Sequence, residues 1–233
     1  MKYVISDIHG EYDKFVNILK KINFNEDDFL YVLGDIVDRG PAPVKVLNDI
    51  KSRDNVCVLL GNHEVMAIDV LSDLIEAGVH NFEEIDLLPE NVRLKMLKWE
   101  THGGDTTLND FSRLSHCERV ELLDFMKSFK LFTEIKRNDG KNVILVHAGL
   151  GNYSDSKKLC DYTVRELTLM RPDFNRIYCD GNTKIIVGHT PTISINLKPE
   201  IYNTGNVTFI DCGAAYNGRL CCLCLDTMRA YYE

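Results

Sequence analysis

The sequence contains no hydrophobic run long enough to cross a lipid bilayer. Apolar runs such as Cys221 to Leu225 fall far short of the roughly 20 residues that a membrane-spanning helix needs. Asp7 interrupts the first apolar stretch before that stretch could act as the hydrophobic region of a secretory leader. We therefore expect the mature chain to start at Met1, to make no contact with a membrane and to work in the cytoplasm.

An excess of positive charge is also missing. The chain has 27 Lys and Arg residues against 35 Asp and Glu residues, which gives a formal net charge of −8. Proteins that hold DNA or RNA through its phosphates carry the opposite sign, so we expect no nucleic-acid partner. Carboxylates that bind divalent cations would account for part of the acidic excess.

Internal repeats, low-complexity tracts and linkers rich in Pro or Ser are absent from the 233 residues. With 45% hydrophobic and 27% charged residues, the composition is that of an ordinary globular protein. The eight cysteines lie scattered through predicted strands, so we expect reduced thiols and no disulfide framework. The sequence predicts one α/β domain over residues 1–233.

Three strand, loop and helix units open the chain. Predicted buried strands at Tyr3–Ser6, Phe29–Leu33 and Val56–Leu60 are each followed by a polar cluster and then by a helical pattern. In α/β sheets the loops that leave the carboxyl ends of strands converge, so these clusters favour a binding site.

The middle of the chain reads as helical and the end as mainly strands. Residues 66–132 predict a helical insertion that forms the rim of the site. A hairpin follows over Ile135–His147, then a strand over Lys184–Val187. Val207–Asp211 and Leu220–Leu225 predict a closing β-region around an Asn217-Gly218 turn.

Polar residues placed directly after predicted strands form a set of possible metal ligands and partners. The set comprises Asp7, His9, Asp35, Asp38, Arg39, Asn62, His63, His147 and His189. Carboxylate, imidazole and amide oxygen together suit Mn, Fe or Zn better than Ca. Asp7 and His9 share one side of an extended segment. Asp35 could divide its oxygens between two ions. Asn62, His147 and His189 would complete the coordination shell of the second ion. The hypothesis is a two-metal site for phosphoryl transfer, with the ions roughly 3.5 to 4 Å apart.

Charge within this site favours a phosphate substrate. Two divalent ions held by two aspartates leave the centre positive, and Arg39 would add bidentate recognition of phosphate oxygens. Asp38 and His63 could pair, so that the carboxylate holds an imidazolium that protonates a departing alkoxide.

Five motifs resemble, in order, the signatures of the calcineurin-like metallophosphoesterases. They are Asp7-Ile8-His9-Gly10, Gly34 to Gly40, Gly61-Asn62-His63-Glu64, Val146 to Gly149 and Gly188-His189. The Asp38-Arg39 pair and Glu64 look like the serine/threonine phosphoprotein phosphatase branch, and the short chain resembles its bacterial and phage lambda-type members.

The resemblance implies a fold and a set of roles. The implied fold is a central β-sandwich of two mixed sheets flanked by helices, in four layers α/β/β/α. Metal one is held by Asp7, His9 and Asp35. Metal two is held by Asp35, Asn62, His147 and His189. Asp38 and His63 match the acid pair, Arg39 matches a phosphate-binding arginine, and Leu167–Pro172 resembles the segment of a second, so Arg171 is the candidate.

The expected function is a metal-dependent serine/threonine-type protein phosphatase. It would hydrolyse phosphomonoesters of a phosphorylated protein or peptide by direct attack of a metal-bridging hydroxide. The expected cofactors are two divalent metal ions, with Mn favoured and Fe or Zn as alternatives. His102 stands where the family often has Asn, and its role stays open. The segment Asp211 to Leu220 resembles a bacterial closing hairpin that lacks the tyrosine-bearing loop of the eukaryotic enzymes. The sequence does not indicate an oligomeric state.

Two alternatives remain. A symmetrical dinucleoside tetraphosphate hydrolase shares the metal motifs, but the resemblance implies that such enzymes lack Asp38 and carry Asp in place of Glu64. The sequence therefore favours the phosphatase. A catalytically silent scaffold of the same fold is the other alternative, and against it stands the observation that every motif position is filled.

Overall fold

The computed structural model describes residues 1–79, 88–179 and 181–233. The strands are β1 (Lys2–Ile5), β2 (Phe29–Val32), β3 (Val56–Val58), β4 (Phe132–Lys136), β5 (Asn142–Val146), β6 (Lys184–Val187), β7 (Tyr202–Thr204), β8 (Val207–Phe209), β9 (Cys221–Cys224) and β10 (Ala230–Tyr232). The α-helices are α1 (Tyr12–Lys21), α2 (Pro43–Lys51), α3 (Asn62–Glu76), α4 (Glu90–Glu100), α5 (Asp105–Ser112), α6 (His116–Lys127), α7 (Val164–Thr168) and α8 (Ile193–Asn196). Short 3-10 turns are η2 (Leu159–Asp161) and η3 (Ala214–Tyr216).

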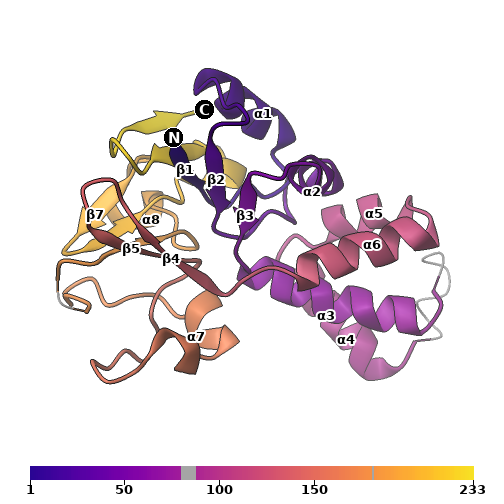
Figure 1. Cartoon of the computed structure of the whole chain (residues 1–233). Helices are drawn as coiled ribbons and strands as arrows, with labels where there is room; N and C mark the ends of the chain where they lie inside the picture. The colour runs from indigo at the N-terminus through magenta and orange to yellow at the C-terminus, as the bar shows by residue number, and fades with distance from the viewer. Residues whose placement is uncertain (80–87, 180) are drawn as a thin grey trace.

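The strands form two five-stranded sheets. The first sheet has the order β10-β9-β1-β2-β3, and the second has the order β4-β5-β6-β8-β7. Both are mixed, because β1–β2–β3 and β5–β6–β8 run parallel while β9, β10, β4 and β7 pair antiparallel. The predicted fold of two mixed sheets flanked by helices is confirmed (Figure 1).

Alternation of side chains along the strands builds the layers. In β5, Val143 and Leu145 join the apolar cluster that also contains Val4 and Leu223 of the first sheet. The intervening Ile144 and Val146 pack on the opposite face, in the cluster that includes Leu167 of α7. This two-residue period places one side of each sheet in the interior of the sandwich.

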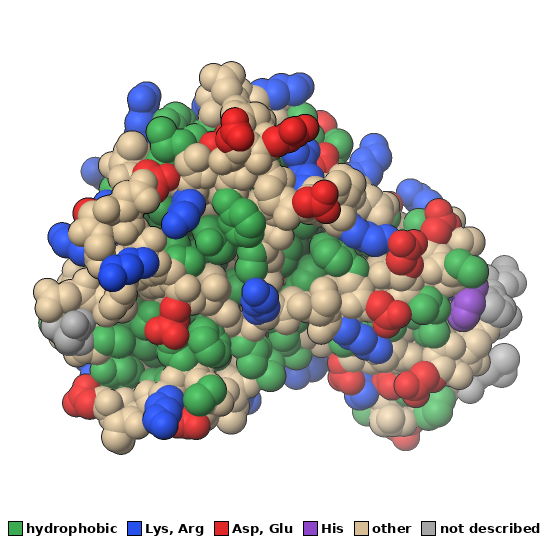
Figure 2. All heavy atoms as spheres, in the orientation of Figure 1, with side chains coloured by type: hydrophobic (Ala, Val, Ile, Leu, Met, Phe, Trp, Pro, Cys, Tyr) green, Lys and Arg blue, Asp and Glu red, His purple; other side chains and the backbone are tan. Residues whose placement is uncertain are grey.

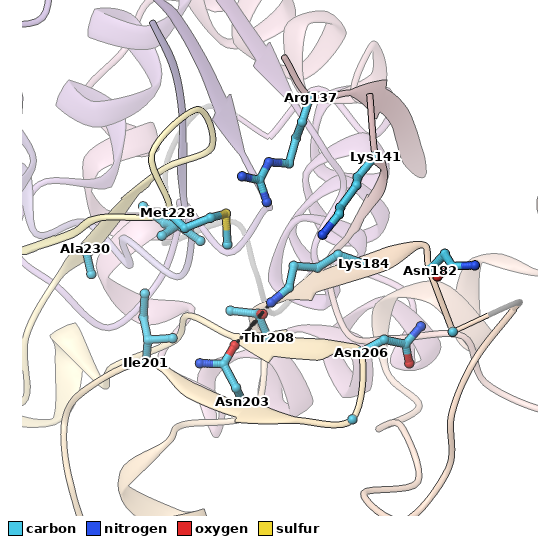
Figure 3. Close-up of a pocket in the computed structure, with 13 residues that line it drawn as sticks. Arg137, Lys141, Asn182, Lys184, Ile201, Asn203, Asn206, Thr208, Met228 and Ala230 are labelled. Atoms are coloured by element: carbon cyan, nitrogen blue, oxygen red, sulfur yellow. Dashed lines mark hydrogen bonds between the residues drawn. The ribbon is translucent and has the colours of Figure 1, made fainter. Parts of the chain in front are cut away.

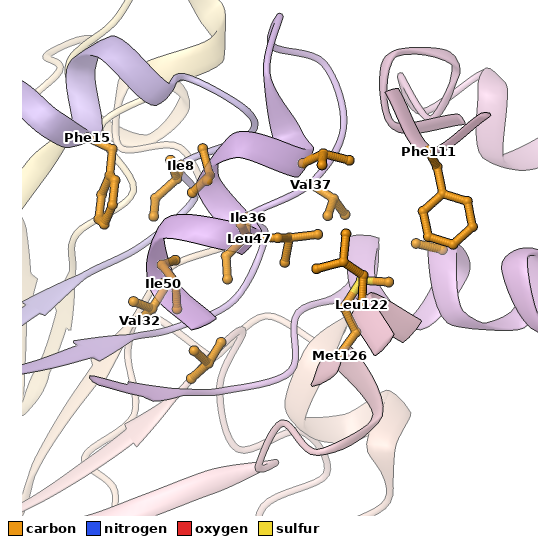
Figure 4. Packing of buried hydrophobic residues seen from close by; sticks show 14 of the residues in the cluster. Ile8, Phe15, Val32, Ile36, Val37, Leu47, Ile50, Phe111, Leu122 and Met126 are labelled. Atoms are coloured by element: carbon orange, nitrogen blue, oxygen red, sulfur yellow. The ribbon is translucent and has the colours of Figure 1, made fainter. Parts of the chain in front are cut away.

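Helices cover the outer face of the first sheet. Phe15 and Ile18 of α1 lie on the predicted apolar stripe and are fully buried. Figure 4 shows Phe15, Ile8 and Leu47 packed near Val32, with Phe111, Leu122 and Met126 continuing the same cluster toward the remaining helices. One continuous core therefore joins the sheet to α5 and α6.

Helices α3 to α6 follow the first three strands in the chain, and the first of them begins before residue 66, the predicted start of the helical insertion. Helix α3 starts at Asn62, so Asn62 and His63 occupy its first turn rather than a loop. Pro89 immediately precedes α4, and Gly103 and Gly104 separate α4 from α5. Residues 80–87 of the predicted helical stretch lie outside the described residues. In Figure 1, α3, α4, α5 and α6 form a lobe beside the sandwich.

Both segments of the predicted closing β-region contain strands, but the expectation that they close one β-region around the Asn217-Gly218 turn is wrong. Strand β8 belongs to the second sheet, whereas β9 pairs with β1 and β10 in the first. The Asn217-Gly218 segment crosses between the sheets. Asn217 has a left-handed φ of 59°, and Gly218 donates its N–H to the carbonyl of Gly213. A tight crossing replaces the hairpin because β9 finds its partners in the amino-terminal strand.

The surface shows no segregation of charge on the face seen in Figure 2. Lys and Arg side chains are interspersed with Asp and Glu over both the sandwich and the helical lobe. Among the described residues, none of the helices has the length and apolar character to traverse a bilayer.

Candidate active site

The loops after β1 and β2 carry a cluster of residues in the left-handed backbone region. Asp7 has φ 52°, His9 has φ 46° and Asp35 has φ 52°. The two loops are bonded to each other, because the Asp7 N–H donates to Gly34 O at 3.1 Å and the His9 N–H to Asp35 O at 2.9 Å. Non-glycine residues adopt this conformation at a cost of roughly 1–3 kcal/mol each, and such residues concentrate at functional sites.

Two imidazoles are held so that the same ring nitrogen faces inward. His9 Nδ1 lies 2.9 Å from Val37 O, and His147 Nδ1 lies 2.6 Å from Leu33 O. A carbonyl partner makes Nδ1 the protonated nitrogen of a neutral ring and leaves Nε2 as a ligand atom. The second sheet delivers His147 at the end of β5, as the sequence predicts.

Asp35 lies at the centre of the histidines. Its Oδ2 is 3.7 Å from His9 Nε2, 3.4 Å from His147 Nε2 and 4.0 Å from His63 Nε2. Two groups of ligand atoms result, His9 with Asp35 and His63, and Asp35 with His147 and His189, each within 4.8 Å of one another. Imidazole nitrogen and carboxylate oxygen at this density fit a divalent transition metal.

The remaining predicted ligands lie around this centre. Asn62 Oδ1 is 3.1 Å from His147 Nε2, so the amide joins the second group. Asp7 is buried but belongs to neither group. Its carboxylate accepts the His189 N–H at 3.2 and 3.0 Å and a hydrogen bond from the Ser6 hydroxyl. All six predicted ligands thus come together, with Asp7 facing the backbone of the loop after β6.

Protonation of the site follows from its burial and its charges. Burial alone would lower the pKa of His147, but the Asp35 carboxylate, with help from Asp7, raises it to about 10. The same ion pair, together with His63, holds the pKa of Asp35 well below its usual range despite burial. Burial lowers the pKa of His9 and of His189 to about 3, so these rings are neutral ligands. A cation bound at His147 would displace its proton.

Asp38 and His63 form the predicted pair. His63 Nδ1 lies 2.6 Å from Asp38 Oδ2. Asp38 is fully buried and also accepts from Trp99 Nε1 at 2.8 Å and from the Thr107 hydroxyl at 2.6 Å. Burial would lower the pKa of His63, but Asp35 and Asp38 raise it above its ordinary value. His63 Nδ1 therefore donates to Asp38, and Nε2 is the ring nitrogen that faces Asp35.

Glu64 organises the loop that carries Asp35. Its two carboxylate oxygens accept backbone N–H groups from Asp35, Ile36, Val37 and Gly61, at 2.8, 2.7, 3.2 and 3.0 Å. The residue is completely buried. These charge-assisted bonds fix the loop after β2 to the first turn of α3.

Two glycines leave room for the carboxylates. A Cβ at Gly61 would lie 2.2 Å from Asp35 Oδ1, and a Cβ at Gly188 would lie 2.2 Å from Asp7 Oδ2. No side chain fits at either position without moving a candidate ligand.

A cavity of about 1110 Å³ opens in front of these groups. Asp35, Asn62, His63 and His189 form its floor. Its walls contain the cations Arg39, Lys98, Arg165 and Arg171 and the apolar residues Val65, Met66, Val164, Leu169 and Pro191. Arg171 therefore reaches the site, as the sequence predicts.

The Arg39 side chain contacts two histidines of the first ligand group. Its guanidinium donates to His9 Nε2, and its Nη2 lies 2.9 Å from His63 Nε2. The ring of Tyr216 lies 4.8 Å from the guanidinium carbon and also lines the cavity. Tyr216 thus brings an aromatic ring to the site from the segment Asp211 to Leu220, and the resemblance of that segment to a bacterial closing hairpin stays a prediction. His102 is an exposed wall residue whose Nδ1 lies 2.8 Å from Lys98 O.

The chain belongs to the calcineurin-like phosphoesterase family, whose model matches residues 3–196. Members of this family are divalent-metal phosphoesterases, and the two ligand groups agree with that class.

Curated relatives are named symmetrical bis(5'-nucleosyl)-tetraphosphatases. The protein of Wigglesworthia glossinidia brevipalpis is 33% identical over 167 residues, which cover 60% of each chain. The protein of Salmonella arizonae is 39% identical over 160 residues, which cover 60% of this chain and 56% of that one. The match thus spans about 60% of these relatives' length.

Solved structures support the fold. A crystal structure described as a putative diadenosine tetraphosphatase has a TM-score of 0.66 at 17% identity and covers 100% of this chain and 92% of its own. A protein serine/threonine phosphatase from Saccharomyces cerevisiae has a TM-score of 0.59 at 16% identity, covering 100% of this chain and 78% of its own.

The expectation of a phage lambda-type protein phosphatase with a phosphoprotein substrate is wrong. The relatives at 30–40% identity carry the tetraphosphatase name, which corresponds to the alternative. The features used to decide between the two readings were Asp38 and Glu64. Neither lines the cavity. Asp38 holds His63 and Glu64 holds the Asp35 loop, so both support the metal groups and do not contact the substrate space.

The resemblance implies that the segment Trp99 to Thr107 lies near the active site, but it assigns no role to Trp99 or Thr107, which support the site from behind. Trp99 and Thr107 are the other donors to Asp38, and they come from the helical segment that carries no ligand motif. A signal does exist there. Trp99 is followed by Gly103-Gly104, and a Cβ at Gly104 would meet the indole at 2.5 Å. A tryptophan packed against a glycine pair indicates a fixed ring rather than a surface helix.

Proposed function

We propose that the chain is a divalent-metal-dependent hydrolase of symmetrical dinucleoside tetraphosphates, which it cleaves into two nucleoside diphosphates. The observation that carries this proposal is the composition of the cavity. Four cations and an apolar wall surround one group of candidate ligands. A tetraphosphate bears a negative charge on every phosphate and carries two aromatic bases, so it requires both features. The names of the relatives support the same substrate class.

The proposed roles follow the geometry. His9 and Asp35 would hold one divalent ion, with Asp7 added as the family resemblance implies, and Asp35, Asn62, His147 and His189 would hold the second, with Mn favoured and Fe or Zn as alternatives. When bound, such ions stabilise charge on the reacting phosphate. Arg39 and Arg171, which both line the cavity, bind phosphate oxygens.

His63 supplies a proton to the leaving group in this proposal. Its Nδ1 is fixed by Asp38, so the Nε2 proton points toward the cavity floor beside Asp35. Asp38 keeps the imidazolium in place through its own bonds to Trp99 and Thr107. A nucleoside diphosphate leaves more easily than an alkoxide, so the demand on this acid is modest.

Lys98 and Arg165 are proposed to bind the outer phosphates. Both are exposed and line the same cavity as Asn62 and His63. They lie on α4 and α7, the walls that frame the opening. A small phosphomonoester would not extend to them, whereas a tetraphosphate would.

The test compares substrates and charge variants. With Mn²⁺ present, diadenosine tetraphosphate is expected to yield only ADP, and to be turned over faster than a phosphopeptide. Lys98→Gln/Arg165→Gln is expected to raise KM for the tetraphosphate about tenfold, the effect of roughly 1.4 kcal/mol of lost phosphate contacts, and to leave p-nitrophenyl phosphate unaffected.

The matched control removes the same charges elsewhere. Lys45 on α2 and Arg93 on α4 are exposed and line no described cavity, so Lys45→Gln/Arg93→Gln should leave KM unchanged. Formation of ATP and AMP, or preference for the phosphopeptide, would contradict the proposal.

A further inference from the structure

A second cavity lies at the opposite end of the second sheet from the candidate active site. Strands β5, β6 and β8 run parallel, and their carboxyl ends lead to His147, His189 and Asp211. Lys184 is the first residue of β6 and lines the second cavity, so this cavity lies at the amino-terminal ends of the same strands. Its volume is about 620 Å³, within the range of small-molecule sites.

Three cations converge in this cavity. Arg137 follows β4, Lys141 precedes β5 and Lys184 begins β6. Figure 3 shows their side chains directed toward one another, with Lys184 between the hairpin and β7. None of the lining residues that the structure describes is Asp or Glu. In a chain of net charge −8, such a concentration of positive charge requires an explanation.

The charges are incompletely paired within the protein. The Arg137 side chain is only 15% exposed, and among the residues that the structure describes its buried Nε has no hydrogen-bond partner. Within residues 1–79, 88–179 and 181–233, its one ion pair is with the half-exposed Asp139, at 3.5 Å. In the same part of the chain, Lys184 Nζ has a single long contact, 3.5 Å to Asn203 Oδ1. Burial, with repulsion from Arg137 and Lys141, lowers the pKa of Lys184. An anion between these groups would satisfy the donor and relieve the repulsion.

The other wall of the cavity is apolar. Ile201, Leu223, Met228 and Ala230 line it, and in Figure 3 Met228 and Ile201 face the cations across the space. Met228 has a left-handed φ of 58°, an unusual conformation for a long side chain. The backbone of Met228 is therefore strained in the turn between β9 and β10, and this turn places the flexible, polarisable side chain at the cavity.

We propose that this basic pocket, formed by Arg137, Lys141, Lys184, Asn203, Ile201 and Met228, is a second ligand site that binds a nucleoside phosphate. The phosphates lie against the three cations, and the base packs on Met228 and Ile201. A free inorganic phosphate would use only the cationic wall and would leave the apolar wall without a function. The proposal does not depend on the reaction performed at the other end of the strands.

Methionine methyl groups provide separate reporters for the two cavities. The chain has six methionines; Met66 lines the candidate active site and Met228 lines the basic pocket. The full chain, labelled with ¹³C at its methionine methyls and supplied with Mg²⁺, is titrated with ADP, inorganic phosphate or adenosine. ADP is expected to shift the Met228 methyl resonance with saturation, and phosphate and adenosine are each expected to bind at least tenfold more weakly.

Charge variants assign the shift to the pocket. Arg137→Gln/Lys141→Gln is expected to raise the Kd read from Met228 at least tenfold and to leave the Kd read from Met66 unchanged. Lys141→Gln alone changes an exposed residue and is expected to weaken binding about threefold, which keeps the test valid if the double variant folds poorly. Lys45→Gln/Arg93→Gln, with two charges removed elsewhere, should change neither value.

Three outcomes would overturn the proposal. ADP could leave Met228 unshifted while it shifts Met66, the double variant could bind ADP as the wild type does, or phosphate could bind at Met228 as tightly as ADP. None of these outcomes bears on tetraphosphate hydrolysis, which is measured separately through its products.

Discussion

The two sheets contribute to the candidate active site in different ways. The loops after β1, β2 and β3 bring most of the candidate ligands, and they are fixed by dense hydrogen bonding to buried carboxylates such as Glu64 and Asp38. The second sheet contributes His147 and His189, which rest on the first sheet. His147 Nδ1 meets Leu33 O, and the His189 N–H donates to Asp7.

This difference indicates that the first sheet holds its candidate ligands in position more firmly than the second sheet does. A loop held by charge-assisted bonds keeps its ligand atoms in place before any cation binds. By contrast, the position of a second-sheet histidine depends on its hydrogen bonds to the first sheet. We therefore expect substitutions in the first-sheet loops to have larger effects than matched substitutions in the second-sheet loops.

The largest effect is expected for Asp35→Asn. Asp35 belongs to both ligand groups, so its loss weakens both, while His189→Asn removes one ligand from the second group only. We expect tetraphosphate hydrolysis to fall more than 100-fold in Asp35→Asn and about 10 to 100-fold in His189→Asn. Initial rates at saturating Mn²⁺ measure both. Asp13→Asn, an exposed change on α1, is the control. Equal losses of activity in Asp35→Asn and His189→Asn would contradict the expected difference between the two sheets.

A smaller effect, on stability, is expected for Glu64→Gln. The carboxylate accepts four backbone N–H groups, and an amide would turn a donor toward them. We expect the free energy of unfolding to fall by about 2–4 kcal/mol. Asp211→Asn is the matched change in the second sheet, where the carboxylate accepts the Gly213 N–H at 2.9 Å, and about 1 kcal/mol is expected. Urea denaturation at pH 7 distinguishes them, and a loss below about 0.5 kcal/mol for Glu64→Gln would rule out its organising role.

The smallest effect is expected for Glu166→Gln, in the loop that carries α7. Glu166 accepts from Lys157, Asn152 and the Thr163 N–H, and these contacts lower its pKa to about 2. Because the pKa in the folded state is depressed, the contribution is complete above the ordinary value near 4.5 and disappears as pH falls toward 2. We expect Tm to drop by about 2–4 °C at pH 7, and by less at pH 3.

Glu118→Gln provides the control for this change. Glu118 caps α6 in the same manner through Ser115, but that helix carries no residue of the active-site cavity. Both variants should lose some stability, and only Glu166→Gln should raise KM, because α7 carries Arg165. A Tm difference for Glu166→Gln that is the same at pH 7 and pH 3 would exclude the ionised carboxylate as its cause.

Much of the fold could be predicted from the sequence because local patterns were unambiguous there. The parallel strands β1, β2 and β3 each end in a polar motif, and the stripe on α1 gives the face that packs on them. The same logic brought His147 and His189 to the site, since strands that end in histidine point their ends to one edge.

The rest depends on contacts that no local pattern encodes. Strand β9 pairs with β1 across more than 200 residues of chain, so a nearby Asn-Gly pair suggested a hairpin that does not form. The substrate class was misjudged for a related reason. Asp38 and Glu64, on which the choice between the two functions rested, do not line the cavity, whereas Lys98 and Arg165, which line it, lie on helices without motifs.

The brevity of β6 leaves the protein little tolerance there. Its four residues separate Lys184 at the basic pocket from Gly188 and His189 at the metal ligands, a span of roughly 13 Å of extended chain. Deleting a single residue would turn every following side chain to the opposite face of the sheet. After such a deletion, Lys184 could keep its place in the basic pocket only if His189 left the candidate ligands, and the reverse also holds. The length of β6 is therefore constrained by both cavities.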